Sequence, residues 1–528
     1  MSGKQYDVII IGAGPGGIFS AYELMKKRPE WKIGVFEGGH ELEKRRCPID
    51  GDKVKSCIRC KSCSIMSGFG GAGAFSDGKY NITNDFGGTL YEYIGKKKAL
   101  ELMQYVDSIN MAHGGEGTKL YSTAGTDFKK ICIQNKLQLL DASVRHLGTD
   151  INYVVLKNLY AEMKDHIEFH FDMPVEHIEA LENSGAAASA NLADNSANDP
   201  ACGADGRADR ATVKTDGSDG TVEKAGKAAA PDSVDIADSA DTDAGAMRYR
   251  IHYSAPASAG GAGTADARYC IVSVGRSGSK WMEKICGELD IPTKSNRVDL
   301  GVRVELPAVV FSHLTDELYE SKIVYRTEKF EDNVRTFCMN PNGIVVNENT
   351  NGIVTVNGHS FEDPSKKTDN TNFALLVSKH FSEPFKDSNG YGESIARLSN
   401  MLGGGVIVQR FGDLERGRRS NAARIEEGTV RPTLQATPGD LSLVLPKRIL
   451  DGIIEMIYAL DKIAPGTANN DTLLYGVEVK FYNMEVRLDE NLETNHPGLY
   501  VIGDGSGVTH SLSHASASGV YVADIISR

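Results

Sequence analysis

A glycine-rich turn near the start of the chain is the feature that most constrains its fold. Gly12-Ala13-Gly14-Pro15-Gly16-Gly17 has the spacing G-x-G-x-x-G, and it directly follows the apolar run Val8–Ile11. Such a β-branched run is typical of a parallel strand buried on both faces, and helix formers follow the turn. In this strand, turn and helix, glycines permit the tight turn, let a pyrophosphate approach the backbone and let the helix pack closely on the strand. We therefore expect four cofactor-binding glycines: Gly12, Gly14, Gly16 and Gly17.

An acidic residue follows the second predicted strand. Lys32–Phe36 is predicted to be this strand, and Glu37 comes directly after it. A carboxylate in this position accepts hydrogen bonds from the adenosine ribose hydroxyls of a dinucleotide. The turn and Glu37 together predict a dinucleotide site, but they do not separate FAD from NAD.

The far end of the chain favours FAD. The sequence from Pro497 to Gly505, which contains Gly503 and Asp504, resembles the second FAD fingerprint of the glutathione-reductase-like flavoproteins. That resemblance implies that Asp504 binds the ribityl chain and that residues 511–519, including Ser513, pass beside the flavin ring. The segment Ile271–Arg276 similarly resembles the strand-to-glycine crossover of that superfamily, which makes Gly275 a further cofactor-binding candidate.

A closer resemblance covers most of the chain. Five segments are similar to a bacterial group of predicted FAD-dependent dehydrogenases with a distinctive C-terminal FAD-dependent domain: Ser67–Lys79, Asn357–Ser360, Asn370–Ser378, Gln435–Asp440 and Leu474–Phe481. Members of this group have no settled substrate, so the resemblance implies the fold and the cofactor rather than the reaction.

The segment Gly68–Gly73 repeats the spacing G-x-G-x-x-G, but no helical pattern follows it. We therefore expect its backbone to pack against FAD instead of forming a second nucleotide site. This adds four candidates for cofactor binding: Gly70, Gly71, Gly73 and Ser76. Lys79 is our candidate for a positive charge near the N1 and O2 edge of the flavin, where it would stabilise the reduced anion.

Four cysteines are crowded between positions 47 and 63. Cys57, Cys60 and Cys63 have the spacing C-x-x-C-x-x-C, and Cys47 precedes them. Four thiolates at this spacing can hold an iron-sulfur cluster that passes electrons to the flavin. A redox pair such as Cys60 and Cys63, structural zinc and inert thiols are the alternatives.

Charge and hydropathy restrict the partners. The net charge of −13 disfavours nucleic acid, which is bound through clustered Lys and Arg. No apolar run approaches the roughly 20 residues of a membrane span, so the expected location is the cytoplasm. The local arginine patch within Gln409–Arg419 is either a clamp for an anionic substrate or a salt-bridged loop. Among the histidines, His514 is the favoured proton donor, because the second FAD motif carries it toward the flavin.

The predicted fold class is α/β, with a Rossmann-like FAD-binding fold of parallel sheet and β-meander and a second α+β substrate domain. We assign residues 1–182, 247–305 and 465–528 to the FAD-binding domain and 306–464 to the substrate domain. Residues 183–246 contain no Phe, Tyr or Trp and are predicted to be a disordered acidic insert. The predicted function is a FAD-dependent oxidoreductase acting on a small molecule or a redox protein, with a possible cysteine relay. The alternative is a flavin-bound sensor without turnover. The sequence does not predict the oligomeric state.

Overall fold

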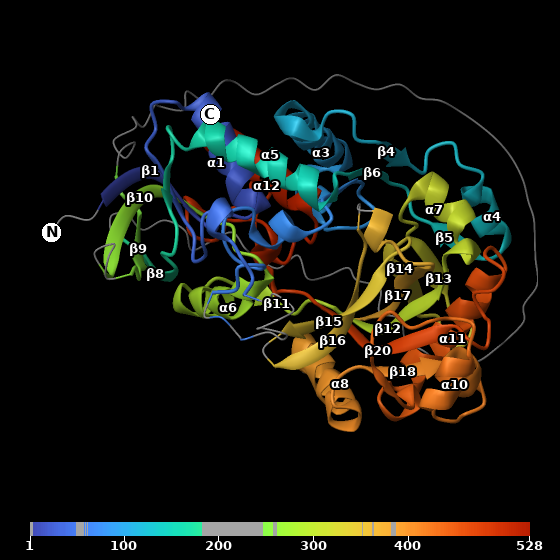
Figure 1. The fold of residues 1–528 in the computed structure, drawn as a ribbon. Helices are drawn as coiled ribbons and strands as arrows, with labels where there is room; N and C mark the ends of the chain where they lie inside the picture. The colour runs from blue at the N-terminus through green and yellow to red at the C-terminus, as the bar shows by residue number, and fades with distance from the viewer. Residues whose placement is uncertain are drawn as a thin grey trace, which may run out of the picture. The chain divides into compact units, whose positions relative to one another are not determined.

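The computed structural model describes residues 4–48, 58, 60, 62–181, 246–256, 261–350, 352–361, 364–381 and 387–528 (Figure 1). Residues 1–181 and 247–528 pack as one unit. The acidic insert predicted for residues 183–246 lies outside the described residues, except for Ala246.

A seven-stranded sheet is formed by segments from both ends of the chain. Its order is β7-β2-β1-β10-β9-β8, and β22 pairs with β10 beyond the end of β9. The strands are β1 (Lys4–Ile11), β2 (Ile33–Phe36), β7 (Glu168–His170), β8 (Val175–Ala180), β9 (Tyr249–Tyr253), β10 (Gly263–Val272) and β22 (Leu499–Val501). The strands β7, β2, β1, β10 and β22 pair in parallel, whereas β8, β9 and β10 form an antiparallel meander. This is the predicted parallel sheet with its β-meander, and the α/β fold class is confirmed.

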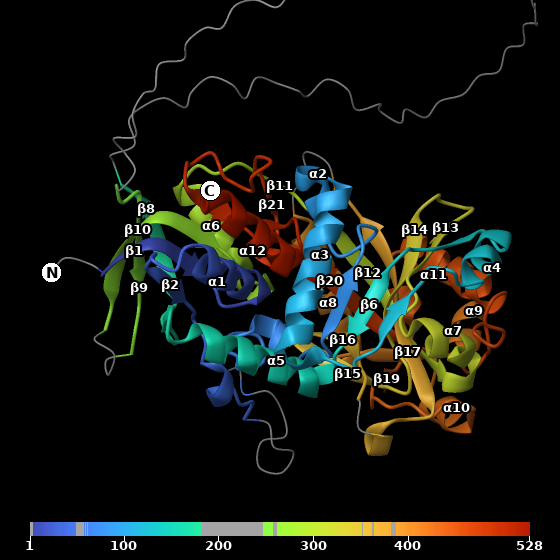
Figure 2. The same ribbon diagram turned by 90° about the horizontal axis from the view of Figure 1, so that it is seen from above.

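Both faces of this sheet are buried, which explains the continuous apolar run in β1. Val8 and Ile10 belong to the core beneath α1 (Pro15–Lys27) and α12 (Leu512–Ile526). Ile9 and Ile11 belong to the opposite core, which includes residues of α6 (Ser279–Glu288). Figure 2 shows α1 and α12 lying side by side, and the Ser20 hydroxyl of α1 donates a hydrogen bond to the Gly519 carbonyl of α12 at 3.1 Å. The first and last helices are therefore direct neighbours.

A second sheet has eight strands in the order β19-β18-β20-β12-β17-β14-β13-β5. Its strands are β5 (Leu137–Leu139), β12 (Val298–Pro307), β13 (Ile323–Arg326), β14 (Asn333–Asn340), β17 (Asn370–Lys379), β18 (Ile407–Arg410), β19 (Thr437–Pro438) and β20 (Leu473–Phe481). Segments that we assigned to the FAD-binding domain contribute β5, β20 and most of β12. The domain division itself stays a prediction.

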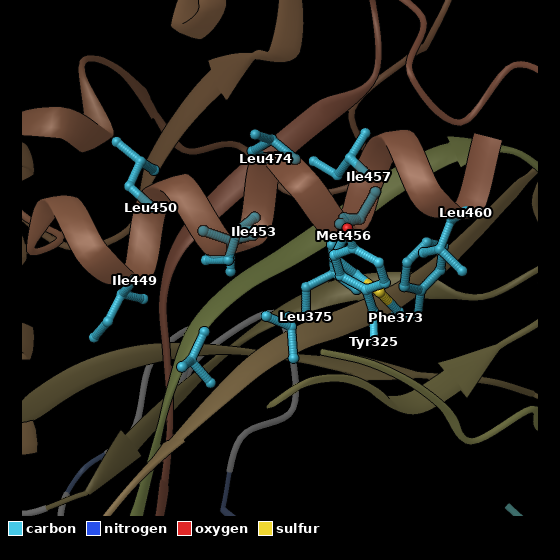
Figure 3. Close-up of a cluster of buried hydrophobic side chains, with 14 of the residues drawn as sticks. Tyr325, Phe373, Leu375, Ile449, Leu450, Ile453, Met456, Ile457, Leu460 and Leu474 are labelled. Carbon is cyan, nitrogen blue, oxygen red and sulfur yellow. The ribbon is translucent and has the colours of Figure 1, made fainter. Parts of the chain in front are cut away.

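One face of the eight-stranded sheet is covered by α11 (Lys447–Asp461). Figure 3 shows Ile453 and Met456 of this helix on the side that faces Phe373 and Leu375 of β17. The alternate residues of β12 place an apolar row in this core: Val298, Leu300, Val302, Val304 and Leu306. The residues between them include the fully buried charged groups Asp299, Arg303 and Glu305. Buried charges require partners: Arg303 and Asp299 form ion pairs, whereas Glu305 accepts hydrogen bonds from neutral side chains.

Shorter elements connect the two sheets. A three-stranded sheet joins β3 (Lys79–Ile82), β6 (Ser143–His146) and β4 (Leu120–Ser122). The strands β15 (Ile344–Thr350) and β16 (Ile353–His359) form a hairpin, and β11 (Thr293–Lys294) pairs with the distant β21 (Glu485–Val486). The other α-helices are α2 (Leu90–Ile94), α3 (Lys96–Asn110), α4 (Phe128–Gln134), α5 (Gly148–Met163), α7 (Ser312–Leu318), α8 (Ser388–Gly403), α9 (Phe411–Glu415) and α10 (Ala422–Glu427). Within the described ranges, none of the helices combines the length and the apolar character needed to cross a membrane.

Candidate functional site

The glycine turn joins the end of β1 to the start of α1, and each glycine in it meets different surroundings. Gly12 has a φ of +103°, and a Cβ atom there would lie well inside 3.0 Å of the Ser273 carbonyl oxygen. A Cβ atom at Gly17 would collide in the same way with the Gly12 carbonyl oxygen, and one at Gly16 would lie 2.7 Å from the Ser273 hydroxyl. At Gly14, by contrast, no atom lies within 4 Å of the Cβ position. The backbone at Gly14 is therefore open for the approach of a ligand to the N-terminus of α1.

Glu37 holds this turn in place. Its carboxylate accepts hydrogen bonds from the backbone N–H groups of Ala13 at 2.8 Å, Gly39 at 2.9 Å and Gly68 at 2.9 Å. A carboxylate offers about four acceptor positions, so one remains for a ligand hydroxyl. Glu37 thus organises three backbone segments in addition to the ribose contact that the sequence predicts for it.

The glycine-rich segment after position 67 lies against the first turn. The Gly70 N–H donates to the Ala13 carbonyl at 2.8 Å, and a Cβ atom at Gly71 would lie 3.2 Å from the Gly14 Cα atom. At Gly73 the nearest atom would belong to Leu512, at the start of α12. The Ser76 hydroxyl donates to the Gly73 carbonyl at 2.8 Å, so it stabilises the segment itself. This segment therefore fills the space between the amino-terminal turn and the last helix.

The carboxyl-terminal motif lies beside the end of β10. Gly503 has a φ of +66°, and the Gly505 N–H donates to the Val274 carbonyl at 2.8 Å. The Asp504 carboxylate is 26% exposed, and its closest charged neighbour is Arg276, at 3.7 Å. Burial raises the pKa of Asp504, and the charge of Arg276 offsets this only in part. At the adjacent Gly275 the Cβ position again faces open space. The carboxylate of Asp504 is thus an acceptor to which no described residue donates a hydrogen bond.

The N-terminus of α12 carries buried polar atoms that lack partners within the described part of the chain: Thr509 Oγ1, Ser513 Oγ, His514 Nε2 and Ser516 Oγ. Ser511 caps the helix, and its hydroxyl lies 2.8 Å from His514 Nδ1. Burial lowers the pKa of His514 to about 4, so its imidazole is neutral near pH 7. Buried polar atoms without partners are costly, so this arrangement fits a polar ligand at the helix terminus. The donor set suits the pyrimidine half of a flavin, so the residues present fit FAD.

Lys79 lies on β3 within a buried group of charges. Its ammonium is 2.8 Å from the Asp77 carboxylate and 3.5 Å from that of Glu320, which also pairs with Lys322. Burial opposes the charge on Lys79, but Asp77 and Glu320 outweigh it and raise the pKa of Lys79 well above its usual value. The charge that we predicted for the flavin edge is therefore already compensated by two protein carboxylates.

The described cysteines of the crowded segment are exposed. They are Cys47, Cys60 and Cys63, whereas Cys57 lies outside the described residues. Ser62, next to Cys63, donates its hydroxyl to the Gly38 carbonyl at 3.3 Å, so this segment lies near the end of β2. In the ranges that the structure describes, no three His, Cys, Asp or Glu side chains gather as a metal site. The iron-sulfur cluster and the cysteine relay stay predictions.

The arginine patch between positions 409 and 419 is internally paired. Arg410 pairs with Asp471, Arg418 lies 2.8 Å from Asp413, and Arg416 donates to the Gly412 carbonyl at 2.6 Å. Arg410 and Arg418 thus have carboxylate partners, as a salt-bridged loop requires, and the clamp for an anionic substrate stays a prediction.

One contributor to the site was not predicted from the sequence. Ser273, at the end of β10, lies next to Gly12, Gly16 and Gly503, and its buried hydroxyl has no partner among the described residues. No short motif signals this serine, because its role depends on two turns that are separated by almost the whole chain.

A comparison with protein families finds a match in the part of the chain that forms most of the second sheet. Residues 299–481 match the family model described as "FAD-dependent protein, C-terminal domain-like". The matched range runs from β12 to β20 and contains seven of the eight strands of the second sheet, all except β5.

Whole-chain relatives are distant. An uncharacterized protein of Clostridium beijerinckii (strain ATCC 51743 / NCIMB 8052) is 25% identical over 542 residues, covering 98% of this chain and 80% of its own length. Among solved structures, glycine oxidase from Geobacillus kaustophilus is 10% identical with a TM-score of 0.37, covering 99% of this chain and 95% of that one. A geranylgeranyl bacteriochlorophyll reductase-like protein from Thermoplasma acidophilum is 8% identical with a TM-score of 0.36, covering 99% and 78% of the two chains.

Proposed function

We propose that this chain is a FAD-dependent oxidoreductase whose cofactor lies between the amino-terminal glycine turn and the start of α12. The observation that carries the proposal is the position of Ser273. A Cβ atom at Gly12 would collide with its carbonyl oxygen, and one at Gly503 would lie 3.3 Å from its hydroxyl. Both FAD motifs therefore meet at one residue of β10, as a single dinucleotide that contacts both motifs requires.

The roles of the side chains follow from this placement. Gly14 and the N-terminus of α1 receive the pyrophosphate, Glu37 a ribose hydroxyl and Asp504 the ribityl chain. When bound, FAD supplies the hydride or electron chemistry of the reaction. Burial keeps His514 neutral near pH 7, and its Nδ1 lies 2.8 Å from the Ser511 hydroxyl. We assign the hydroxyl as the donor of this pair, which puts the proton of the ring on Nε2. His514 is then a hydrogen-bond donor at the N-terminus of α12, and its function as a proton donor is part of the proposal.

Cofactor binding is tested first. We expect purified protein to carry flavin absorbance, or to quench FAD fluorescence in a saturable titration after the cofactor is removed. Folded protein that is colourless and does not take up FAD contradicts the proposal.

Turnover separates the enzyme from the sensor. Anaerobically photoreduced protein is mixed with quinones, redox proteins and small-molecule oxidants, and flavin reoxidation is followed by absorbance. Repeated cycles with one class of acceptor are expected of an oxidoreductase. Protein that changes conformation on reduction, but completes no cycle with any acceptor or donor, is the sensor instead.

A separate titration tests the proposed cysteine relay. Anaerobic titration with dithionite counts the electrons that each FAD-loaded chain accepts, and iron and labile-sulfide analysis detects a cluster. The described cysteines are exposed, and Ser62, next to Cys63, bonds to the Gly38 carbonyl after β2. If the flavin is the only redox group, each FAD-loaded chain takes up two electrons. Uptake of four electrons that falls to two in Cys60→Ser/Cys63→Ser would instead establish the dithiol.

A further inference from the structure

Arg297 lies directly before β12 and is tied to the Asp504 turn through its neighbours. The Asn296 amide donates to the Gly507 carbonyl at 3.1 Å and to the Asn483 carbonyl at 3.0 Å. The Asn483 amide in turn donates to the Asp504 carbonyl at 2.7 Å. The backbone that carries Arg297 is therefore fixed to the segment that leads into α12.

Aromatic contacts extend this connection to the guanidinium group. It lies over the Tyr482 ring, 4.9 Å from the ring centroid. The Tyr482 ring makes an edge contact with His510 at 4.7 Å, and His510 lies between the Asp504 turn and α12. Arg297 therefore belongs to the shell of residues around the N-terminus of this helix.

The charge of Arg297 is not balanced by its surroundings. Among the described residues no carboxylate forms an ion pair with Arg297. The buried carboxylate of Asp299, whose pKa Arg297 influences, pairs with Arg335 and also accepts a hydrogen bond from the Tyr482 hydroxyl at 2.6 Å. Burial opposes the ionisation of Asp299, but Arg335 and then Arg297 lower its pKa to about 2. One carboxylate thus faces two guanidinium groups, which leaves one positive charge in excess. The Nε atom of Arg297 is buried without a hydrogen-bond partner in the described part of the chain.

The histidines of this region add no charge of their own. Burial, assisted by Arg297, lowers the pKa of His510 to about 3, and that of His514 is about 4. Both rings are therefore neutral near pH 7. Next to them, the 15-residue helix α12 presents its N-terminus together with the unpartnered, fully buried His514 Nε2 and Ser513 Oγ. An excess cation, a helix N-terminus and unpaired polar atoms together favour an anionic group at this place.

We propose that Arg297 is the cation that stabilises the negative charge on the pyrimidine half of the reduced flavin. Reduction by two electrons with uptake of one proton leaves one negative charge, shared by N1 and the C2 carbonyl oxygen. Arg297 supplies the opposite charge, whereas Lys79 forms ion pairs with Asp77 and Glu320. This inference rests on the proposed binding of FAD, and it names the residue that sets the electron affinity of the cofactor.

Sulfite tests the inference without turnover. Sulfite adds to N5 of oxidised flavin, and the adduct places the same negative charge on the pyrimidine half. In FAD-loaded Arg297→Gln we expect sulfite to bind about tenfold more weakly, the size typical for loss of one charge-assisted hydrogen bond. The midpoint potential, measured with xanthine oxidase and a reference dye, should fall by about 30 mV, which is a tenfold change for a two-electron couple.

Three further variants make the result specific. Lys294→Gln removes the same charge from an exposed side chain three residues away that pairs with Glu485, and it should leave sulfite affinity unchanged. Lys79→Gln should also leave it unchanged, whereas Arg297→Lys, which keeps the charge, should lose less than Arg297→Gln. If Arg297→Gln does not fold, Arg297→Met replaces it, because it also removes the charge, and an equal sulfite affinity and an unchanged potential in that variant contradict the proposal.

The outcomes separate this inference from the proposed function. Loss of sulfite affinity in Lys79→Gln but not in Arg297→Gln overturns it and returns the role to Lys79. Equal sulfite affinity in native protein and folded Arg297→Gln overturns it outright. Native protein that binds no FAD refutes the proposed function itself.

Discussion

Gly17 packs so closely against Gly12 that no Cβ atom fits between them, whereas the Cβ position of Gly14 faces open space. This difference predicts that the same substitution to alanine affects cofactor binding at Gly14 and stability at Gly17. Gly14→Ala should leave the melting temperature of the cofactor-free protein unchanged, because Gly14 already has the extended backbone that alanine adopts. It should weaken FAD binding about tenfold or more, because the added methyl group occupies the approach of the pyrophosphate. Gly17→Ala should destabilise the fold by roughly 1–3 kcal/mol, the usual cost of overpacking.

Thermal denaturation with and without FAD measures the stability of the two variants, and quenching of FAD fluorescence measures their affinity for the cofactor. The proposed pyrophosphate position is wrong if Gly14→Ala binds FAD with native affinity.

The buried carboxyl of Asp504 is expected to lower the stability of the cofactor-free protein while it favours FAD binding. Burial raises its pKa, so the folded protein without cofactor resists ionisation of this group. A carboxyl whose folded pKa is raised favours the folded state below its unfolded pKa, near 3.9, and loses this contribution as the pH rises through the folded pKa. Near pH 7, Asp504→Asn should therefore increase the melting temperature of the cofactor-free protein while it weakens FAD binding. An exposed control, Asp489→Asn, should do neither.

The cofactor turns could be predicted because each is a contiguous motif whose chemistry is local. The strand before Gly12 and the turn at Asp504 both carry their own signals in fewer than ten residues, and the parallel sheet with its meander followed from them. The alternation of Val8 and Ile9 between two cores is likewise implied by the apolar run itself.

What could not be predicted depends on pairs of distant segments. Glu37 binds the backbone of Gly68, and Ser273 joins the two FAD motifs, yet neither residue has a sequence signature for that role. Arg297 becomes part of the site through Asn483, on another segment of the chain. Lys79 was interpreted as a free cation because its partner Glu320 is far away in sequence.

The ion pair in the middle of the eight-stranded sheet predicts a large and non-additive effect on stability. Arg303 and Glu478 are both fully buried and joined by two hydrogen bonds of 2.7 Å. Removing only the cation leaves a buried carboxylate with Lys480 as its remaining charged partner, at 3.2 Å. Arg303→Met should therefore cost about 3–5 kcal/mol, and Arg303→Met/Glu478→Leu less than the sum of the single changes.

Urea unfolding followed by tryptophan fluorescence measures these free energies. The exposed pair of Arg326 and Glu331 is the matched control, and Arg326→Met should cause no detectable loss. If the losses in free energy of unfolding from the single changes at Arg303 and Glu478 add up to the loss in the double variant, the two side chains do not act as a pair.

The buried histidines predict that stability falls in mild acid. Burial lowers the pKa of His170 from 6.5 to about 4, and Lys4 adds to this effect. A histidine with a lowered folded pKa contributes stability above its unfolded pKa, and this contribution is lost as the pH falls from about 6.5 toward 4. His170 lies beside the proposed ribose contact, because its carbonyl accepts a hydrogen bond from the Glu37 N–H at 2.9 Å, and its Nε2 is 2.8 Å from the Tyr6 hydroxyl. The pH profiles are therefore measured on cofactor-free protein, so that FAD binding does not contribute. Between pH 6.5 and 4.5 the native protein should lose on the order of 1–3 kcal/mol more than His170→Gln, measured by urea unfolding at each pH. Parallel pH profiles for native protein, His170→Gln and the exposed control His177→Gln would show that the acid sensitivity arises elsewhere.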